Sequence, residues 1–287
     1  MKAKFNILVV YCGILALFTS CKNEIVNLKQ PESVVATEAF IYVANVNGSS
    51  DKKDGNGYIS KLYKNGKVYD TVFIGNLDAP KGLCMIKNTL YFTDIDKVLG
   101  YNIITKEKVF ECDLSSYKTH FLNDVCKGDS NSIFVSATDI NEIFKINLSN
   151  KNVTPLEFNR DLIGPNGLDY WNDTLCVTEL GNDSIRGGLA LIEFKGIRII
   201  YDRLVYDVGY LDGVFHVNNN IVFSDWVSFN EKEKVAKLKL FNLETRQITE
   251  VKAPAMSGCA DIFYDKQKQQ IIAPLMNENK VIFIPVK

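Results

Sequence analysis

Histidine is scarce in this chain of 287 residues, which contains only His120 and His216. The sequence also lacks a Cys-x-x-Cys pair, a Gly-x-Ser-x-Gly elbow, a phosphate-binding loop and a Gly-x-Gly-x-x-Gly turn. These absences exclude the common zinc sites, the nucleophile of α/β-hydrolases and the usual nucleotide-binding loops. A single strand histidine is more often packed than catalytic, so His216 is expected to be structural.

Neither sign of charge dominates, since 33 basic residues stand against 34 acidic residues and the net charge is −1. The chain has no long basic run. Nucleic acid is therefore not an expected partner, because binding to it requires a basic surface. Proline is also rare, with seven residues, whereas the 13 tyrosines and 17 phenylalanines are typical of a β-rich fold.

Disulfide bonds are not expected, although export would permit them. The number of cysteines that follow Cys21 is odd, and most of them lie in or beside hydrophobic strand segments. We expect buried free thiols that act as small apolar residues. The five are Cys84, Cys112, Cys126, Cys176 and Cys259.

The N-terminal segment has the features of an export signal. Lys2 and Lys4 precede the apolar run Ile7–Phe18, which is shorter than the roughly 20 residues of a membrane-spanning helix. The run ends in Leu17-Phe18-Thr19-Ser20-Cys21, which resembles a bacterial lipobox. The alternative is an ordinary cleaved signal with a chance cysteine.

The lipobox-like pattern divides the start of the chain into two parts. It predicts a lipoprotein signal peptide at 1–20, lipidation of Cys21 and a polar tether at 21–33. The expected location is the bacterial cell envelope, in the periplasm or at the outer-membrane surface, with the lipid as the membrane anchor.

A short signature recurs along the rest of the chain: a small loop, an innermost strand, a polar turn and a second strand. Its copies are offset by about 42 to 48 residues, the spacing of four-stranded propeller blades. We predict one all-β domain at 34–287, a six-bladed β-propeller of four-stranded blades. Val34–Thr37 is expected to complete a terminal blade, so that N- and C-terminal strands close the ring.

The repeat places one residue per blade at the mouth of a central channel: Lys81, Asn123, Asn166, Asp212 and Ala260. Asn123, Asn166 and Asp212 offer amide oxygens and a carboxylate, which suit a hard divalent cation such as Ca²⁺. The alternative is that these side chains only stabilise the turn before each strand. The long insertion Trp226–Val235 is expected to overhang the same mouth.

Three of these segments resemble the SMP-30/gluconolactonase/luciferin-regenerating family of six-bladed propellers. They are Phe121-Leu122-Asn123-Asp124, Gly164-Pro165-Asn166-Gly167-Leu168 and Leu211-Asp212-Gly213. The resemblance implies that Asn166 and Asp212 are metal ligands, that Asp212 is the catalytic base of lactone hydrolysis, and that Asn123 contacts substrate or metal-bound water. It also implies a first-blade Glu, for which Glu38 is the nearby candidate, although the family's Glu-x-Pro-x-Trp motif is absent.

Two functions are therefore compatible with the sequence. The first is a metal-dependent lactonase or sugar-acid hydrolase that uses Asp212, with Lys81 and Asn123 as substrate-binding residues. The second is a non-catalytic lipoprotein that holds a carbohydrate, another small molecule or a protein at the channel mouth. The sequence makes no prediction of the oligomeric state.

Overall fold

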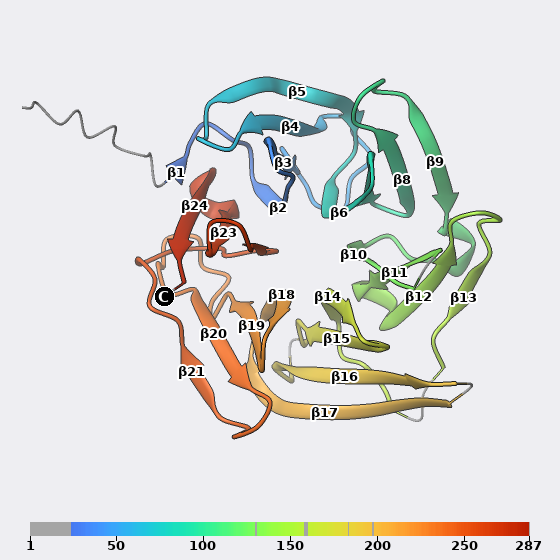
Figure 1. Ribbon diagram of the computed structural model, residues 1–287, viewed down its shortest axis with the longest axis vertical. Coiled ribbons are helices and arrows are strands. Elements are labelled where there is room, and N and C mark those ends of the chain that lie inside the picture. The colour runs from blue at the N-terminus through green and yellow to red at the C-terminus, as the bar shows by residue number, and fades with distance from the viewer. Residues whose placement is uncertain (1–23, 130, 158–159, 183, 197, 287) are drawn as a thin grey trace, which may run out of the picture.

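The computed structural model describes residues 24–286 apart from 130, 158–159, 183 and 197. This part of the chain forms six four-stranded antiparallel sheets in a ring around a central axis (Figure 1). The predicted six-bladed β-propeller is confirmed. The predicted signal peptide and Cys21 lie outside the described residues. Within them, no helix has the length and apolarity needed to cross a membrane.

The first three blades are β2 (Pro31–Ala36), β3 (Phe40–Asn45), β4 (Gly57–Tyr63) and β5 (Val68–Leu77); β6 (Pro80–Ile86), β7 (Thr89–Asp94), β8 (Lys97–Asn102) and β9 (Lys108–Asp113); and β10 (Leu122–Lys127), β11 (Ser132–Ala137), β12 (Glu142–Asn147) and β13 (Val153–Pro155). The next two are β14 (Pro165–Trp171), β15 (Thr174–Glu179), β16 (Gly187–Lys195) and β17 (Arg198–Gly209); and β18 (Leu211–Val217), β19 (Asn220–Asp225), β20 (Lys237–Asn242) and β21 (Ile248–Glu250). The last combines β22 (Phe263–Asp265), β23 (Gln270–Leu275), β24 (Lys280–Pro285) and β1 (Glu24–Ile25). Short 3₁₀ turns occur at η1 (Ser115–Tyr117), η2 (Thr138–Ile140) and η3 (Met276–Glu278).

The hydrophobic core lies between neighbouring blades, not at the axis. One apolar cluster, for example, joins Tyr91 and Phe110 of the second blade to Ile133 and Phe144 of the third. The second strand of each blade is buried on both faces, because it is covered by the blade on either side; β7 and β11 show this pattern. The axis itself is left to the innermost strands, which surround it (Figure 1).

The strand that closes the ring differs from the expectation. Val34–Thr37 does not complete a terminal blade, because Val34 and Val35 pair with β3 in the innermost strand of the first blade. Closure comes instead from β1, in which Glu24 and Ile25 pair with β24 of the last blade. The described propeller strands therefore start at Glu24, and the stretch predicted as tether (21–33) already includes β1 and the start of β2.

Each innermost strand carries a bulge at the same place. In the second blade, Pro80 pairs with Asp94 and the next paired residue, Leu83, is opposite Phe92. Two residues of the innermost strand thus lie opposite one residue of the second strand, which re-aims their side chains. The same step recurs in the blades of β2, β10, β14 and β18. In the last blade, the bridge between Cys259 and Leu275 and the pairing of Phe263 with Ile272 imply the same offset.

The five described cysteines are all free and buried, as expected from their positions in strands. Burial raises the pKa of the Cys84 thiol to about 12. Such a thiol stays protonated at neutral pH and behaves as a small apolar group.

Candidate functional site

The bulges build two layers of side chains inside the channel, at the end where the innermost strands begin. We call this end the upper mouth, and the end where these strands finish the lower mouth. The first bulge residues of the six blades form the upper layer: Glu32, Lys81, Asn123, Asn166, Asp212 and Ala260. Each of them is at most 6 % exposed. The structure thus places all the residues predicted for the mouth in one register position.

Three oxygens of the upper layer are buried without a hydrogen-bond partner among the described residues. They are Oε2 of Glu32, Oδ1 of Asn166 and Oδ1 of Asp212. Buried polar atoms in proteins nearly always have a partner, so each exception calls for a water, an ion or a ligand. All three are hard oxygen donors, and they come from different blades.

Glu32 is the residue that the sequence interpretation missed. Glu38, the nearby candidate, is exposed and lies in the turn after β2, whereas Glu32 is buried at the bulge. A sequence signal for it exists in the run Pro31-Glu32-Ser33, which matches Pro80-Lys81-Gly82 and Pro165-Asn166-Gly167 in having proline followed by a polar and then a small residue. The signal is masked because Val34–Thr37, the apolar run beside it, also fits a closing strand.

The second bulge residues form a lower layer with two more carboxyl groups. Asp124 accepts hydrogen bonds from the backbone N–H of Val125 (2.7 Å) and of Leu168 (2.6 Å). Asp261 accepts one from the Ser33 hydroxyl at 2.5 Å. A Cβ atom on Gly82 would lie 2.4 Å from Oδ1 of Asp124, so this glycine makes room for the carboxylate.

The channel holds more negative than positive groups. Burial, followed by the charges of Asp212 and Asp261, raises the pKa of Glu32 well above its usual range, although Lys81 opposes this effect. Burial also raises the pKa of Asp124 to about 7 and that of Asp212 to about 7. Without a bound cation, these acids tend to keep their protons near neutral pH.

Lys81 is held by the first of two long insertions at this mouth, which is the loop between β3 and β4 (residues 46–56). Its Nζ donates to the backbone oxygen of Ser50 at 2.8 Å and lies 4.3 Å from the centre of the Phe121 ring. Burial lowers the pKa of Lys81 to about 8, whereas the charges of Glu32 and Asp94 oppose the decrease. The ammonium therefore fixes the insertion over the upper mouth, and a substrate would have to compete with Ser50 for it.

The second long insertion reaches the same mouth, as expected. The indole Nε1 of Trp226 donates to Oδ2 of Asp212 at 2.8 Å, whereas Oδ1 of the same carboxylate has no hydrogen-bond partner among the described residues. Phe229 packs against Trp226 and Tyr210, with ring centres 5.6 and 4.6 Å apart. Two insertions thus cover the upper layer and would control access to it.

His216 lies at the other end of β18, and its contacts are those of a packed residue and not of a catalytic one. Its ring stacks on Trp171 with centres 4.0 Å apart, and its backbone N–H donates to Asp169 at 2.6 Å. It lines the lower mouth together with Asp169 and does not contribute to the upper layer.

The donor set of the upper layer fits a divalent cation by its chemistry. In the described part of the chain, no three His, Cys, Asp or Glu side chains cluster closely enough to hold a metal. The upper-layer set is of a different kind because it combines two carboxylates, Glu32 and Asp212, with the amide oxygen of Asn166. The three unpartnered oxygens are what such an ion would satisfy.

Comparisons with known proteins show a similarity of fold only. No protein-family model matches the chain, and no curated protein matches it in sequence. Solved structures do match: hydrazine synthase of Kuenenia stuttgartiensis (TM-score 0.63, 13% identity, 88% of this chain and 75% of that one) and a streptogramin B lyase (0.62, 13%, 90% and 94%). Virginiamycin B lyase from Staphylococcus aureus is similar as well (0.60, 15%, 92% and 98%). At these identities the likeness shows the propeller architecture and carries no activity over to this chain.

Proposed function

We propose that the chain is a metal-dependent lactonase or sugar-acid hydrolase of the SMP-30/gluconolactonase type. The observation that carries the proposal is the set of unpartnered buried oxygens on Glu32, Asn166 and Asp212. Glu32 supplies the first-blade carboxylate that the resemblance requires. These three residues would hold the cation, with Ca²⁺ favoured because every donor is a hard oxygen.

Asp212 has the properties of a general base. Trp226 orients the carboxylate through Oδ2, so that Oδ1 would face both the cation and the attacking water. Burial raises the pKa of Asp212 to about 7 before a cation binds, and a bound cation would favour the ionised form that a base requires. When bound, a divalent cation supplies Lewis-acid polarisation of the lactone carbonyl. Asn123, in the same layer, would orient the substrate.

A binding role without turnover is the second candidate, and one observation favours it. The whole upper layer is buried and covered by two insertions, one of them fixed through Lys81. In that case the site holds a cation for stability, and the exposed face binds a carbohydrate or a protein. Both candidates act at the cell envelope if Cys21 carries a lipid.

The first experiment measures thermal stability with and without Ca²⁺, because a ligand that binds only the folded state raises the melting temperature. We expect Ca²⁺ to stabilise the wild type, and Glu32→Gln and Asp212→Asn each to reduce that response strongly. Glu38→Gln is the matched control, since it removes an exposed acid of the same blade and should leave the response unchanged.

The second experiment measures hydrolysis of a panel of sugar lactones with Ca²⁺, Mn²⁺, Zn²⁺ and Mg²⁺. Asp212→Asn should abolish any rate that the wild type shows. A cation response without turnover would select the binding role. If no cation stabilises the protein and no lactone is hydrolysed above the buffer blank, the metal site itself is wrong.

A further inference from the structure

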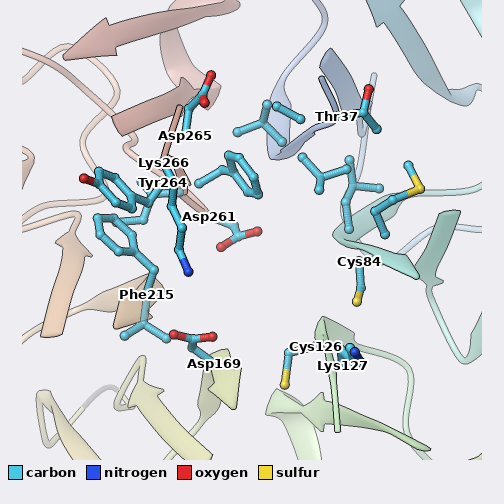
Figure 2. Close-up of a pocket in the computed structure, with 18 of the residues that line it drawn as sticks. Thr37, Cys84, Cys126, Lys127, Asp169, Phe215, Asp261, Tyr264, Asp265 and Lys266 are labelled. Atoms are coloured by element: carbon cyan, nitrogen blue, oxygen red, sulfur yellow. The ribbon is translucent and has the colours of Figure 1, made fainter. Parts of the chain in front are cut away.

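A second site lies at the opposite end of the channel. A cavity of about 500 Å³ opens at the lower mouth, between the ends of the innermost strands and the turns that follow them (Figure 2). Pockets for small molecules typically have volumes of about 300–1,000 Å³. Glu32, Asn166 and Asp212 do not line this cavity, although Asp261, which does, lies next to the proposed metal site because its backbone N–H donates to the Glu32 carbonyl at 3.0 Å.

The wall of the cavity includes a collar of apolar residues, one from each blade, whose side chains also pack into the core between blades. They follow the bulge directly and are Val34, Leu83, Val125, Leu168, Val214 and Ile262. Nearer the opening, Phe215 and Tyr264 stack with ring centres 5.2 Å apart, and Cys84 and Cys126 border the cavity while they also pack into the core between blades (Figure 2). Such a wall favours a hydrocarbon body over a sugar, because it offers little hydrogen bonding.

The floor of the cavity is acidic. Asp261 is 8 % exposed and projects its carboxylate into the space (Figure 2). Its Oδ2 accepts from the Ser33 hydroxyl, and the backbone N–H of Ile262 also donates to the carboxylate, so a ligand would share these oxygens with protein donors. A Cβ atom on Gly213 would lie 2.7 Å from Oδ1 of Asp261, so the fold keeps this position clear for the carboxylate. Asp124 lies at the same level, and Asp169 adds a third carboxylate on the wall.

Positive charge at this mouth lies on the rim. Lys64 is paired with Asp265 at 2.6 Å, and Lys127 and Lys266 are exposed. A ligand that enters thus meets basic groups first, then the apolar collar, then buried carboxylates. The inner end of this path complements a cation, because an ammonium donates up to three hydrogen bonds to carboxylates and its hydrocarbon body fills the collar.

We propose that the cavity at the lower mouth is a binding site for a primary amine with an apolar body, whose ammonium group contacts Asp261. Neither an anion nor a neutral alcohol of equal length would form the ammonium–carboxylate ion pair with Asp261. The proposed amine site uses other side chains than the proposed hydrolase centre, although the two adjoin where Asp261 contacts Glu32.

The probe is n-hexylammonium chloride, titrated calorimetrically into the full chain, with 1-hexanol and sodium hexanoate as matched neutral and anionic probes. We expect hexylammonium to bind about tenfold or more tightly than either. Asp261→Asn should lower the affinity for hexylammonium by about tenfold and leave that for hexanol nearly unchanged. Glu38→Gln, which removes an exposed carboxylate at the rim of the same cavity, should change neither affinity.

Two further measurements keep the proposal testable. Asp169→Asn removes the wall carboxylate and should weaken hexylammonium alone, which gives a second variant if Asp261→Asn fails to fold. Asp212→Asn should retain amine binding while it loses any response to Ca²⁺, so that failure of one site can be told from failure of the other. Equal affinities for hexylammonium and hexanol, or displacement of hexylammonium by micromolar Ca²⁺, would overturn the proposal.

Discussion

Single residues decide the chemistry of this channel, and Glu32 shows how. The sequence identifies Asn123, Asn166 and Asp212 because each stands in a recognisable repeat. Glu32 stands in a copy with serine where other copies have glycine or aspartate, so the repeat does not distinguish it. The run Pro31-Glu32-Ser33 is only a weak signal, and the role of Glu32 becomes clear from the register of β2 and from the unpartnered Oε2. The contact of Trp226 with Asp212 likewise cannot be predicted from the sequence, because it depends on the conformation of the insertion Trp226–Val235.

Asp169 should make stability depend on pH. Burial raises its pKa to about 6, although the N–H groups of His216 and Tyr170 oppose the rise. A raised carboxyl pKa adds stability that is fully present below about pH 4, the unfolded value, and lost as the pH rises through about 6. Relative to wild type, Asp169→Asn should therefore gain about 2 kcal/mol of unfolding free energy between pH 4 and pH 7.

Urea unfolding at a series of pH values tests this expectation, because the midpoint and slope together give the free energy of unfolding. The difference between the two proteins isolates Asp169 from the other acids of the channel. A difference that stays constant from pH 4 to pH 7 would show that Asp169 titrates normally.

At the scale of elements, long strands are predictable from the sequence and the shortest is not. The strands of the second blade follow from alternating apolar residues and polar turns, and β6 to β9 lie where that pattern places them. β1 has only two residues, too few to show any period. The pattern therefore favours closure by the next apolar run, Val34–Thr37, which instead belongs to the innermost strand of the first blade.

Ring closure by β1 gives a direct test with two neighbouring residues. Ile25 is 3 % exposed and packs with Leu28, Ile41 and Val281, whereas Val26 is 44 % exposed. Ile25→Ala should cost about 2–4 kcal/mol because it leaves a cavity between the first and last blades. Val26→Ala should change the stability by less than about 0.5 kcal/mol.

Chemical unfolding of both variants measures the two values. Equal effects would mean that β1 does not hold the ring together. The comparison is sharp because the two substitutions are adjacent and remove similar groups.

At the scale of the molecule, the ring presents two chemically different mouths. The upper mouth has hard oxygen donors beneath two insertions, and the lower mouth has an open apolar cavity with an acidic floor. The repeat spacing predicts the ring and the upper mouth. It does not predict the lower cavity, because that depends on how far six strand ends stand apart.

The lipobox-like run that ends at Cys21 predicts that the whole molecule is attached to a membrane. We expect the mature N-terminus to be a diacylglyceryl cysteine, and Cys21→Ser to release the protein from the membrane fraction. Mass spectrometry of the N-terminal peptide and detergent phase partitioning measure both outcomes. A mature form that begins at another residue, without lipid, would exclude the anchor.

The bulge that recurs in every blade has a consequence for how such channels diversify. Its two residues fall outside the regular pairing of β2, β6 and their counterparts, so their side chains have no fixed neighbour across the sheet. Substitutions at the first of the two can exchange acid, amide, base or methyl group while the hydrogen bonding between strands stays intact, whereas the second is glycine in three blades because a Cβ atom there would meet neighbouring atoms. Glu32, Lys81, Asn166 and Ala260 already sample those four chemistries within one molecule. The strand pairing thus stays the same while the side chains in the channel vary, which explains how closely similar rings can persist among proteins with little sequence in common.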